Sequence, residues 1–185
     1  MLEVNFSPFP DLYTSRFYLR KFTPEDKEDM FELRSNPEVM KYIPRPLAVN
    51  MEDAAKHIDV LQKALDNNEG INWAIVEPDS KKVIGIIGFF NIIKEFYRAE
   101  IGYMLNPKWH NKGIMHEVLQ KIIVYGFEDL KLHSIEAIIA PENTASGKLL
   151  QKNKFRKEGA FKQNCFFEGK FLDSEVYSLV KGIDY

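Results

Sequence analysis

Between Glu100 and Glu117 the chain passes from an apolar, strand-like stretch through a short polar loop directly into an amphipathic helical pattern that starts at Ile114. At such a junction the first backbone N–H groups have no partner inside the helix, and the helix dipole adds positive potential. A phosphate group can therefore dock on the loop and the first helical turn. The segment predicts a strand, an anion site and a helix in succession, with a phosphorylated cofactor as the first candidate ligand.

Composition is that of a folded globular chain. The 185 residues are 45% hydrophobic and 13% aromatic, which is enough to fill a sizeable core and argues against a disordered or disulfide-stapled chain. We expect one domain over residues 1–185. The 25 basic and 27 acidic residues give a formal charge of −2 and are dispersed, so no nucleic-acid partner is expected.

Cysteine and histidine usage also narrows the setting. Cys165 is the single cysteine, which excludes an internal disulfide, and the four histidines lack metal-ligand spacing, so no metal is expected. The first ten residues do not resemble a signal peptide, and the most apolar run, Val83 to Ile93, is too short to span a bilayer. The sequence favours a cytoplasmic protein without a membrane partner.

Hydrophobic periodicity and capping residues predict seven strands and four helices. We expect strands at 16–20, 71–77, 83–93, 97–105, 135–140, 158–167 and 171–180. We expect helices capped at Thr23, Asn50 and Asn143, and one that runs from Ile114 to Phe127.

The connections between these elements predict a mixed, mostly antiparallel sheet of the α/β (α+β) class. Short links join the strands at 71–77, 83–93 and 97–105 into a meander, and residues 168–170 form a hairpin. The only long crossover joins the strand that ends at Leu105 to the one that begins near Ile135. Ligands of α/β sheets often lie beyond the strand ends near such a crossover, where the anion loop is also placed.

An ordered set of motifs resembles the GNAT superfamily of N-acetyltransferases, in particular its RimJ/RimL-like branch, over nearly the whole chain. The matching segments are Thr14 to Arg20, Asn36 to Tyr42, Glu100 to Tyr103, Trp109 to Gly113, Asn143 to Ser146 and Asp173 to Leu179. The resemblance implies a single-domain GNAT-like fold that uses acetyl-CoA as acetyl donor. It implies that the coenzyme A pyrophosphate binds at the loop-to-helix junction and that pantetheine pairs with the strand before it.

The resemblance also implies site residues. Cofactor contacts would come from Tyr103, Met104, Leu105, His110, Asn111, Lys112, Gly113, Ile114, Met115, His116, Asn143 and Ser146. Ser146 would assist the departing thiolate, and Glu100 is the nearby carboxylate candidate for a base. These residues also have ordinary structural interpretations. Asn143 would cap a helix and Ser146 would lie in its first turn. Glu100 would be a strand-edge charge, and Lys112 and His116 would be solvated.

Four positions depart from the superfamily pattern: His110 and Met115 in the loop, Leu150 where many members carry a tyrosine acid, and Cys165 where RimL-like enzymes carry an acidic base. Two functions therefore stay open. The first is an N-acetyltransferase acting on an amine, either a protein N-terminus or a small molecule, as a monomer or homodimer. The second is a catalytically degenerate module that binds acyl-CoA or a protein partner without turnover.

Overall fold

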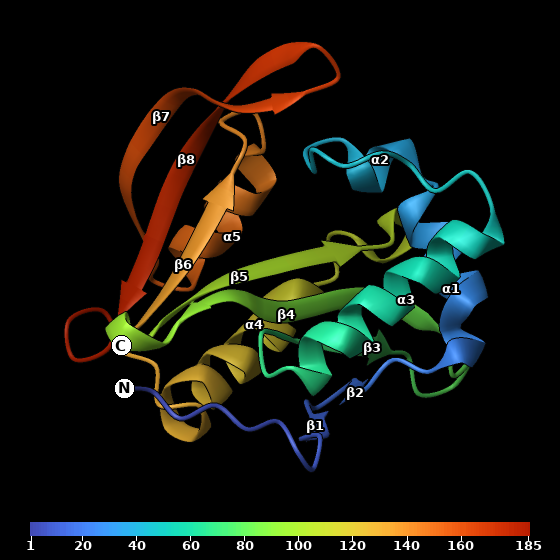
Figure 1. The fold of residues 1–185 in the computed structure, drawn as a ribbon, viewed down its shortest axis with the longest axis horizontal. Coiled ribbons are helices and arrows are strands. Elements are labelled where there is room, and N and C mark those ends of the chain that lie inside the picture. Colours follow the sequence, from blue (N-terminus) through green and yellow to red (C-terminus); the bar gives the residue numbers. More distant parts are fainter.

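The structure, a computed structural model, describes residues 1–185 and contains one sheet of eight strands in the order β1-β2-β3-β4-β5-β6-β8-β7 (Figure 1). The strands are β1 (Leu12–Tyr13), β2 (Tyr18–Arg20), β3 (Ile71–Val76), β4 (Val83–Ile93), β5 (Arg98–Leu105), β6 (Ser134–Ile139), β7 (Arg156–Phe167) and β8 (Lys170–Val180). All neighbours are antiparallel except β5 and β6, which are parallel. The predicted mixed sheet, meander and crossover are confirmed.

The strand count of seven was too low by one. Strand β1 pairs Leu12 with Leu19 and Tyr13 with Tyr18. A strand of two residues is too short to show a periodicity of its own, so only its pairing with β2 reveals it.

The helix count of four was also too low. The structure has α1 (Lys27–Arg34), α2 (Pro37–Met40), α3 (Met51–Asp66), α4 (Ile114–Val124) and α5 (Thr144–Lys152). The additional helix is α2, a single turn capped by Asn36, whose side chain accepts a hydrogen bond from Glu38 N. The Asn36-Pro37 pair ends the preceding helix and also starts this one, because asparagine caps a helix and proline fits its first position. Helix α4 continues through a π-helical turn, Tyr125–Asp129.

Two helical layers cover the sheet (Figure 1). Helices α1 and α3 lie on one face of β2–β5, where Met30, Ala54 and Ile58 form a small core with Ala74 and Ile86. Helices α4 and α5 lie on the other face, over the main core. Its largest fully buried members include Trp73, Phe89, Phe127, Leu119 and Ile122.

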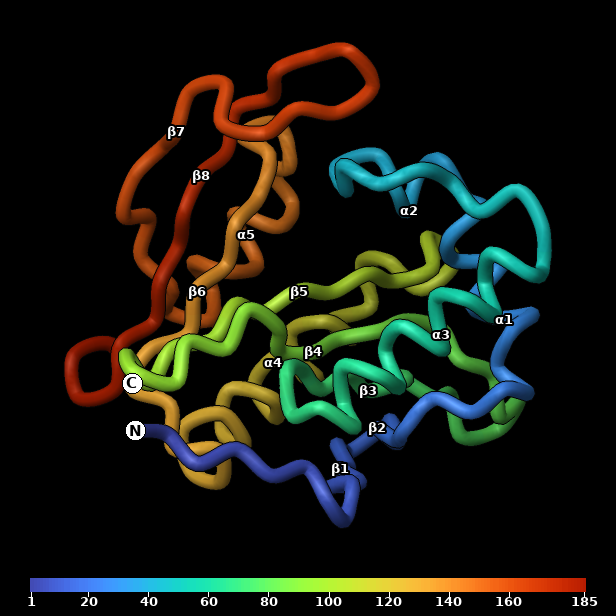
Figure 2. Tube along the Cα trace, viewed as in Figure 1, coloured from blue at the N-terminus to red at the C-terminus, as the bar shows by residue number.

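The last two strands form the predicted hairpin. Its two-residue turn has Glu168 at φ 48° and Gly169 at φ 78°, the two positive values that a type I′ turn requires. Strands β6, β8 and β7 run at an angle to β3–β5, as the tube in Figure 2 shows. No helix of the protein is both long and apolar enough to cross a bilayer.

Candidate functional site

The parallel strands β5 and β6 are paired over only three residues. Arg98, Ala99 and Glu100 face Ser134, Ile135 and Glu136, and beyond these pairs β5 stays bound to β4 while β6 stays bound to β8. The two strands therefore diverge, as Figure 1 shows. From Ile101 to Leu105 the edge of β5 that faces β6 has no strand partner, so an extended ligand can pair with it.

The loop-to-helix junction presents free backbone donors near this opening. Gly113 is the N-cap of α4 with φ 72°, and the first hydrogen bond of the helix runs from Glu117 N to Gly113 O at 3.1 Å. The N–H groups of Ile114, Met115 and His116 precede it and have no helical partner. The side chains of Ile114 and Met115 are buried in the main core, so only their backbones face the ligand side. Methionine at this position therefore does not obstruct the amides.

Side chains from the turn between β1 and β2 brace this junction. Arg16 donates from Nε to Glu117 Oε2 at 2.7 Å and from Nη1 to the Lys112 carbonyl at 3.1 Å, and the Ser15 hydroxyl donates to Glu117 Oε1 at 2.8 Å. Burial raises the pKa of the Glu117 carboxyl, but hydrogen bonds from Thr14, Arg16 and Ser15 outweigh burial and lower it to about 2. Sequence reasoning missed this brace because its partners are about a hundred residues apart.

Of the remaining predicted residues, His110 and Lys112 hold the loop in shape. His110 Nε2 is 3.0 Å from the Leu105 carbonyl, so the ring closes the loop back onto the end of β5. The Lys112 ammonium lies 4.8 Å from the centre of the Trp109 ring, a cation–π contact rather than a free charge. Asn111 has φ 59°, and His116 Nδ1 is buried without a hydrogen-bond partner.

Tyr103 and Ser146 meet across the opening. Their hydroxyl oxygens are 2.6 Å apart, with Tyr103 on β5 and Ser146 in the first turn of α5. Asn143 caps α5 by accepting a hydrogen bond from Ser146 N at 3.2 Å, which fixes the serine. Burial raises the pKa of Tyr103 to about 12, although its hydrogen bond with Ser146 acts in the opposite direction. Leu150 is fully buried and takes no part.

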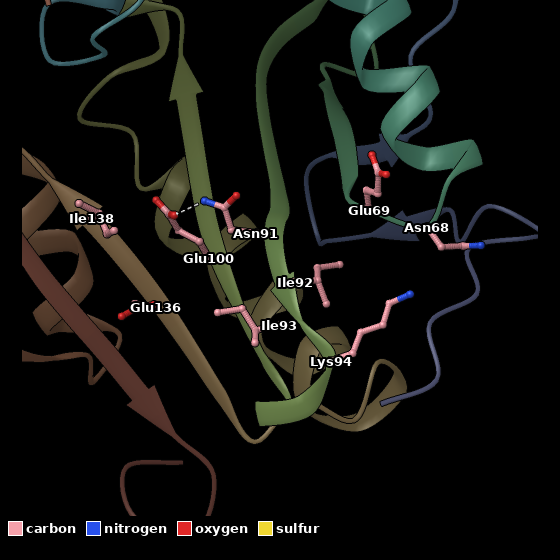
Figure 3. Close-up of a pocket in the computed structure, with 9 residues that line it drawn as sticks. All are labelled: Asn68, Glu69, Asn91, Ile92, Ile93, Lys94, Glu100, Glu136 and Ile138. Atoms are coloured by element: carbon pink, nitrogen blue, oxygen red, sulfur yellow. Dashed lines mark hydrogen bonds between the residues drawn. The ribbon is translucent and has the colours of Figure 1, made fainter. Parts of the chain in front are cut away.

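Glu100 lies on the face of the sheet opposite Tyr103, because successive side chains of a strand point to alternate faces and these two residues are three positions apart. It lines an open cavity of about 620 Å³ between the ends of β4, β5 and β6 and the end of α3. In Figure 3, Asn91 points toward Glu100, and its amide donates to Glu100 Oε2 at 2.8 Å. Burial raises the pKa of Glu100, the Asn91 hydrogen bond lowers it, and the Glu136 carboxylate raises it.

Asn91 and Glu136 are site residues that sequence reasoning missed. Asn91 has φ 48° and occupies an irregularity of β4 between Phe90 and Ile93, which turns its amide toward Glu100. A polar asparagine inside an otherwise apolar run was the available signal for a bulge. Glu136 faces the same cavity from β6 and lies 3.5 Å from Arg98 Nε.

Cys165 lies on the outermost strand β7, opposite Leu172, and is partly exposed. No group of three or more histidine, cysteine, aspartate or glutamate side chains is arranged to hold a metal ion.

Comparison with known proteins agrees with this architecture. Residues 16–156 match the Acetyltransf_3 family, described as an acetyltransferase (GNAT) domain. The chain is 38% identical to an uncharacterised N-acetyltransferase, YoaA, of Bacillus subtilis, over 94% of this chain and 98% of that protein. It is 33% identical to the ribosomal protein uS5-alanine N-acetyltransferase of Escherichia coli, over 58% of this chain and 56% of that protein.

A solved structure of a GNAT-family acetyltransferase from Bacillus anthracis superposes with a TM-score of 0.82. It is 32% identical, with 92% of this chain and 98% of that chain covered. The diverging strands, the glycine-capped helix and these relatives lead to one conclusion. The chain belongs to the GNAT acetyltransferase family and is an N-acetyltransferase.

Proposed function

We propose that this protein transfers the acetyl group of acetyl-CoA to a primary amine, with an α-amine of a protein N-terminus or a small molecule as acceptor. The observation that carries the proposal is the opening between β5 and β6. On the face of the sheet that α4 and α5 cover, the opening ends at the free backbone amides of α4. On the opposite face, the carboxylate of Glu100 lines an open cavity. We further propose that residues 1–185 form one domain, because all eight strands belong to one sheet.

Acetyl-CoA fits the residues that are present. The N–H groups of Ile114, Met115 and His116, together with the left-handed Gly113, form a backbone site for the pyrophosphate. The unpaired edge of β5 from Tyr103 to Leu105 offers backbone groups to pantetheine. Arg16 offsets the negative charge of Glu117, which would otherwise repel a phosphate at this helix end. When bound, acetyl-CoA supplies the acetyl thioester.

The reaction needs one bond formed and one broken. The neutral amine nitrogen attacks the acetyl carbonyl carbon, the new C–N bond forms, and the C–S bond breaks to release the thiolate. Glu100 takes the proton that the amine loses, directly or through a water molecule, and its raised pKa makes it a better base than an ordinary carboxylate. Ser146 donates a hydrogen bond to the departing sulfur from the other face of the sheet.

The E. coli relative named for an alanine substrate supports an α-amine acceptor and a place in the RimJ/RimL-like branch. Three carboxylates, those of Glu69, Glu100 and Glu136, line the open cavity together with one ammonium, that of Lys94. The excess of acidic groups favours a cationic amine over an anionic acceptor.

Thermal unfolding with and without acetyl-CoA tests the donor. At a ligand concentration of about 100 times the dissociation constant, the stabilisation is about 2.7 kcal/mol, which raises the melting temperature by several degrees. An unmoved melting curve at millimolar acetyl-CoA would refute the donor assignment. Release of free thiol with a panel of amines then tests transfer. Binding without release of thiol for any amine would instead identify a non-catalytic acyl-CoA-binding module.

A further inference from the structure

The phenol oxygen of Tyr103 makes a hydrogen bond that the packing of its ring does not require. That oxygen lies 2.6 Å from Ser146 Oγ, and each is the only side-chain hydrogen-bond partner of the other. The ring packs against the main core, while the hydroxyl reaches Ser146 in the first turn of α5. Ser146 is buried, at 8% exposed, and Tyr103 is partly buried.

A neighbouring tyrosine provides a contrast. Tyr177 on β8 also approaches the start of α5, where its hydroxyl would lie 3.2 Å from a Cβ added to Gly147. Its hydroxyl, however, donates to Glu175 Oε2 at 3.1 Å and makes no bond to Ser146. Two tyrosine hydroxyls thus lie near the start of α5, and only that of Tyr103 bonds to the serine.

We propose that Tyr103 is a positioning residue for acetyl transfer, which donates its hydrogen to Ser146 Oγ and thereby directs the Ser146 hydrogen toward the departing sulfur. The inference rests on the proposed function. A serine hydroxyl has one hydrogen and can rotate freely about its C–O bond. The phenol is the stronger acid of the two, so it is the better donor and the serine oxygen the better acceptor.

The state of Tyr103 suits this role over the working range of pH. With its pKa raised to about 12, the hydroxyl keeps its proton at neutral pH and always has a hydrogen to donate. The thiolate that leaves has a reference pKa near 8.5, so the Tyr103–Ser146 pair need not give up a proton completely. It stabilises the negative charge on sulfur through a hydrogen bond while the C–S bond breaks, and the thiolate then takes its proton from solvent.

The test is a double-mutant cycle with Tyr103→Phe, Ser146→Ala and the double variant, and Tyr177→Phe as the matched control. Single-turnover acetyl transfer reports chemistry, and titration calorimetry gives the acetyl-CoA dissociation constant. We expect roughly a tenfold loss of rate for Tyr103→Phe and ten- to a hundredfold for Ser146→Ala, with dissociation constants nearly unchanged. The double variant should be no slower than Ser146→Ala, because a positioning residue has no effect once its partner is gone. Tyr177→Phe should keep the wild-type rate.

A second readout separates positioning from a purely structural effect. The selenoester analogue of acetyl-CoA releases a selenol that is much more acidic than the thiol and needs less help to leave. The losses caused by Tyr103→Phe and by Ser146→Ala should both shrink with this donor. Additive losses in the cycle, or equal losses with both donors, would overturn the inference. Equal losses of Ser146→Ala with both donors would overturn the inference even if Tyr103→Phe folds poorly, because Tyr103 can act on the sulfur only through Ser146. Failure of the wild-type protein to bind acetyl-CoA would refute the proposed function itself, which the calorimetry detects separately.

Discussion

The two faces of the opening between β5 and β6 are built in different ways. On the side of α4 and α5, the helix start is braced by Arg16 and Glu117, and Tyr103 and Ser146 are joined at 2.6 Å. On the other side an open cavity of about 620 Å³ has one hydrogen bond between its lining side chains, from Asn91 to Glu100 (Figure 3). The proposed donor side is thus a backbone site fixed by packing, while the proposed acceptor side consists of side chains around open space. Donor binding should depend on backbone geometry, and acceptor choice on a few side chains.

The largest expected effect concerns the acceptor side. At pH 7.5 an α-amine of pKa near 7.8 is roughly one-third neutral, whereas a lysine amine of pKa near 10.4 is about 0.1% neutral. The difference corresponds to about 3.5 kcal/mol of proton removal, or roughly 300-fold in rate, at 1.36 kcal/mol per pKa unit.

We therefore expect peptide N-termini or amino acids to be acetylated faster than lysine side chains or polyamines. Activity should rise with pH through the pKa of the acceptor. Initial rates over matched concentrations of both classes provide the measurement. Faster acetylation of a polyamine than of every α-amine tested would show that the carboxylates of the cavity remove protons more effectively than we infer.

On the donor side, Gly113→Val should weaken acetyl-CoA binding by roughly ten- to a hundredfold, because a β-branched residue at φ 72° is strained by about 1–3 kcal/mol and relieves that strain by moving the backbone that presents the amides. Lys112→Ala is the matched control in the same loop. It should change the dissociation constant by only a few fold, because the ammonium already lies on Trp109. Calorimetric titration compares the two variants. An equal or larger loss for Lys112→Ala would mean that side-chain charge, not backbone geometry, holds the phosphates.

The smallest effect tests the single hydrogen bond of the acceptor side. A base must be ionised, so a raised pKa of Glu100 places the acidic limb of kcat/KM at higher pH than an ordinary glutamate would. The Asn91 hydrogen bond lowers that pKa, so Asn91→Gly, which removes the amide but tolerates φ 48°, should move the limb to still higher pH.

We expect Asn91→Gly to lose roughly three- to tenfold in kcat/KM near pH 6 and little near pH 8, since a hydrogen bond to a charged group is worth about 1.5–3 kcal/mol and part of it is replaced by water. Glu100→Gln should remove the part of the limb that belongs to Glu100 and leave only the titration of the acceptor amine. The charged groups that bear on Glu100 from neighbouring elements are Glu136 and Arg45, and both stay in place in these variants. A limb that persists unchanged in Glu100→Gln would assign the base to another group.

Much of the donor side could be predicted from the sequence. The loop-to-helix junction, the cap at Asn143 and the crossover between β5 and β6 depend on local patterns, namely a glycine before a helical stripe, an asparagine at a helix start and an apolar strand on either side of a helix. Each of these patterns is formed by residues that are close together in the chain, so it can be recognised in the sequence alone. Roles in catalysis for Ser146 and Glu100 stay predictions, as do the cytoplasmic location and the oligomeric state.

Other features were decided only by tertiary structure. Arg16 meets Glu117, Tyr103 meets Ser146, and β1 exists only as a partner of β2, because each contact joins segments that the sequence does not place together. The length of pairing between β5 and β6 is another such feature, since beyond three residues β5 stays paired only with β4 and β6 only with β8. The sequence by itself determined the order of the longer elements and the loop-to-helix junction at Gly113, because hydrophobic period and helix capping are local. Only the folded chain decided which side chains face each other across the opening, because those contacts depend on the packing of whole elements.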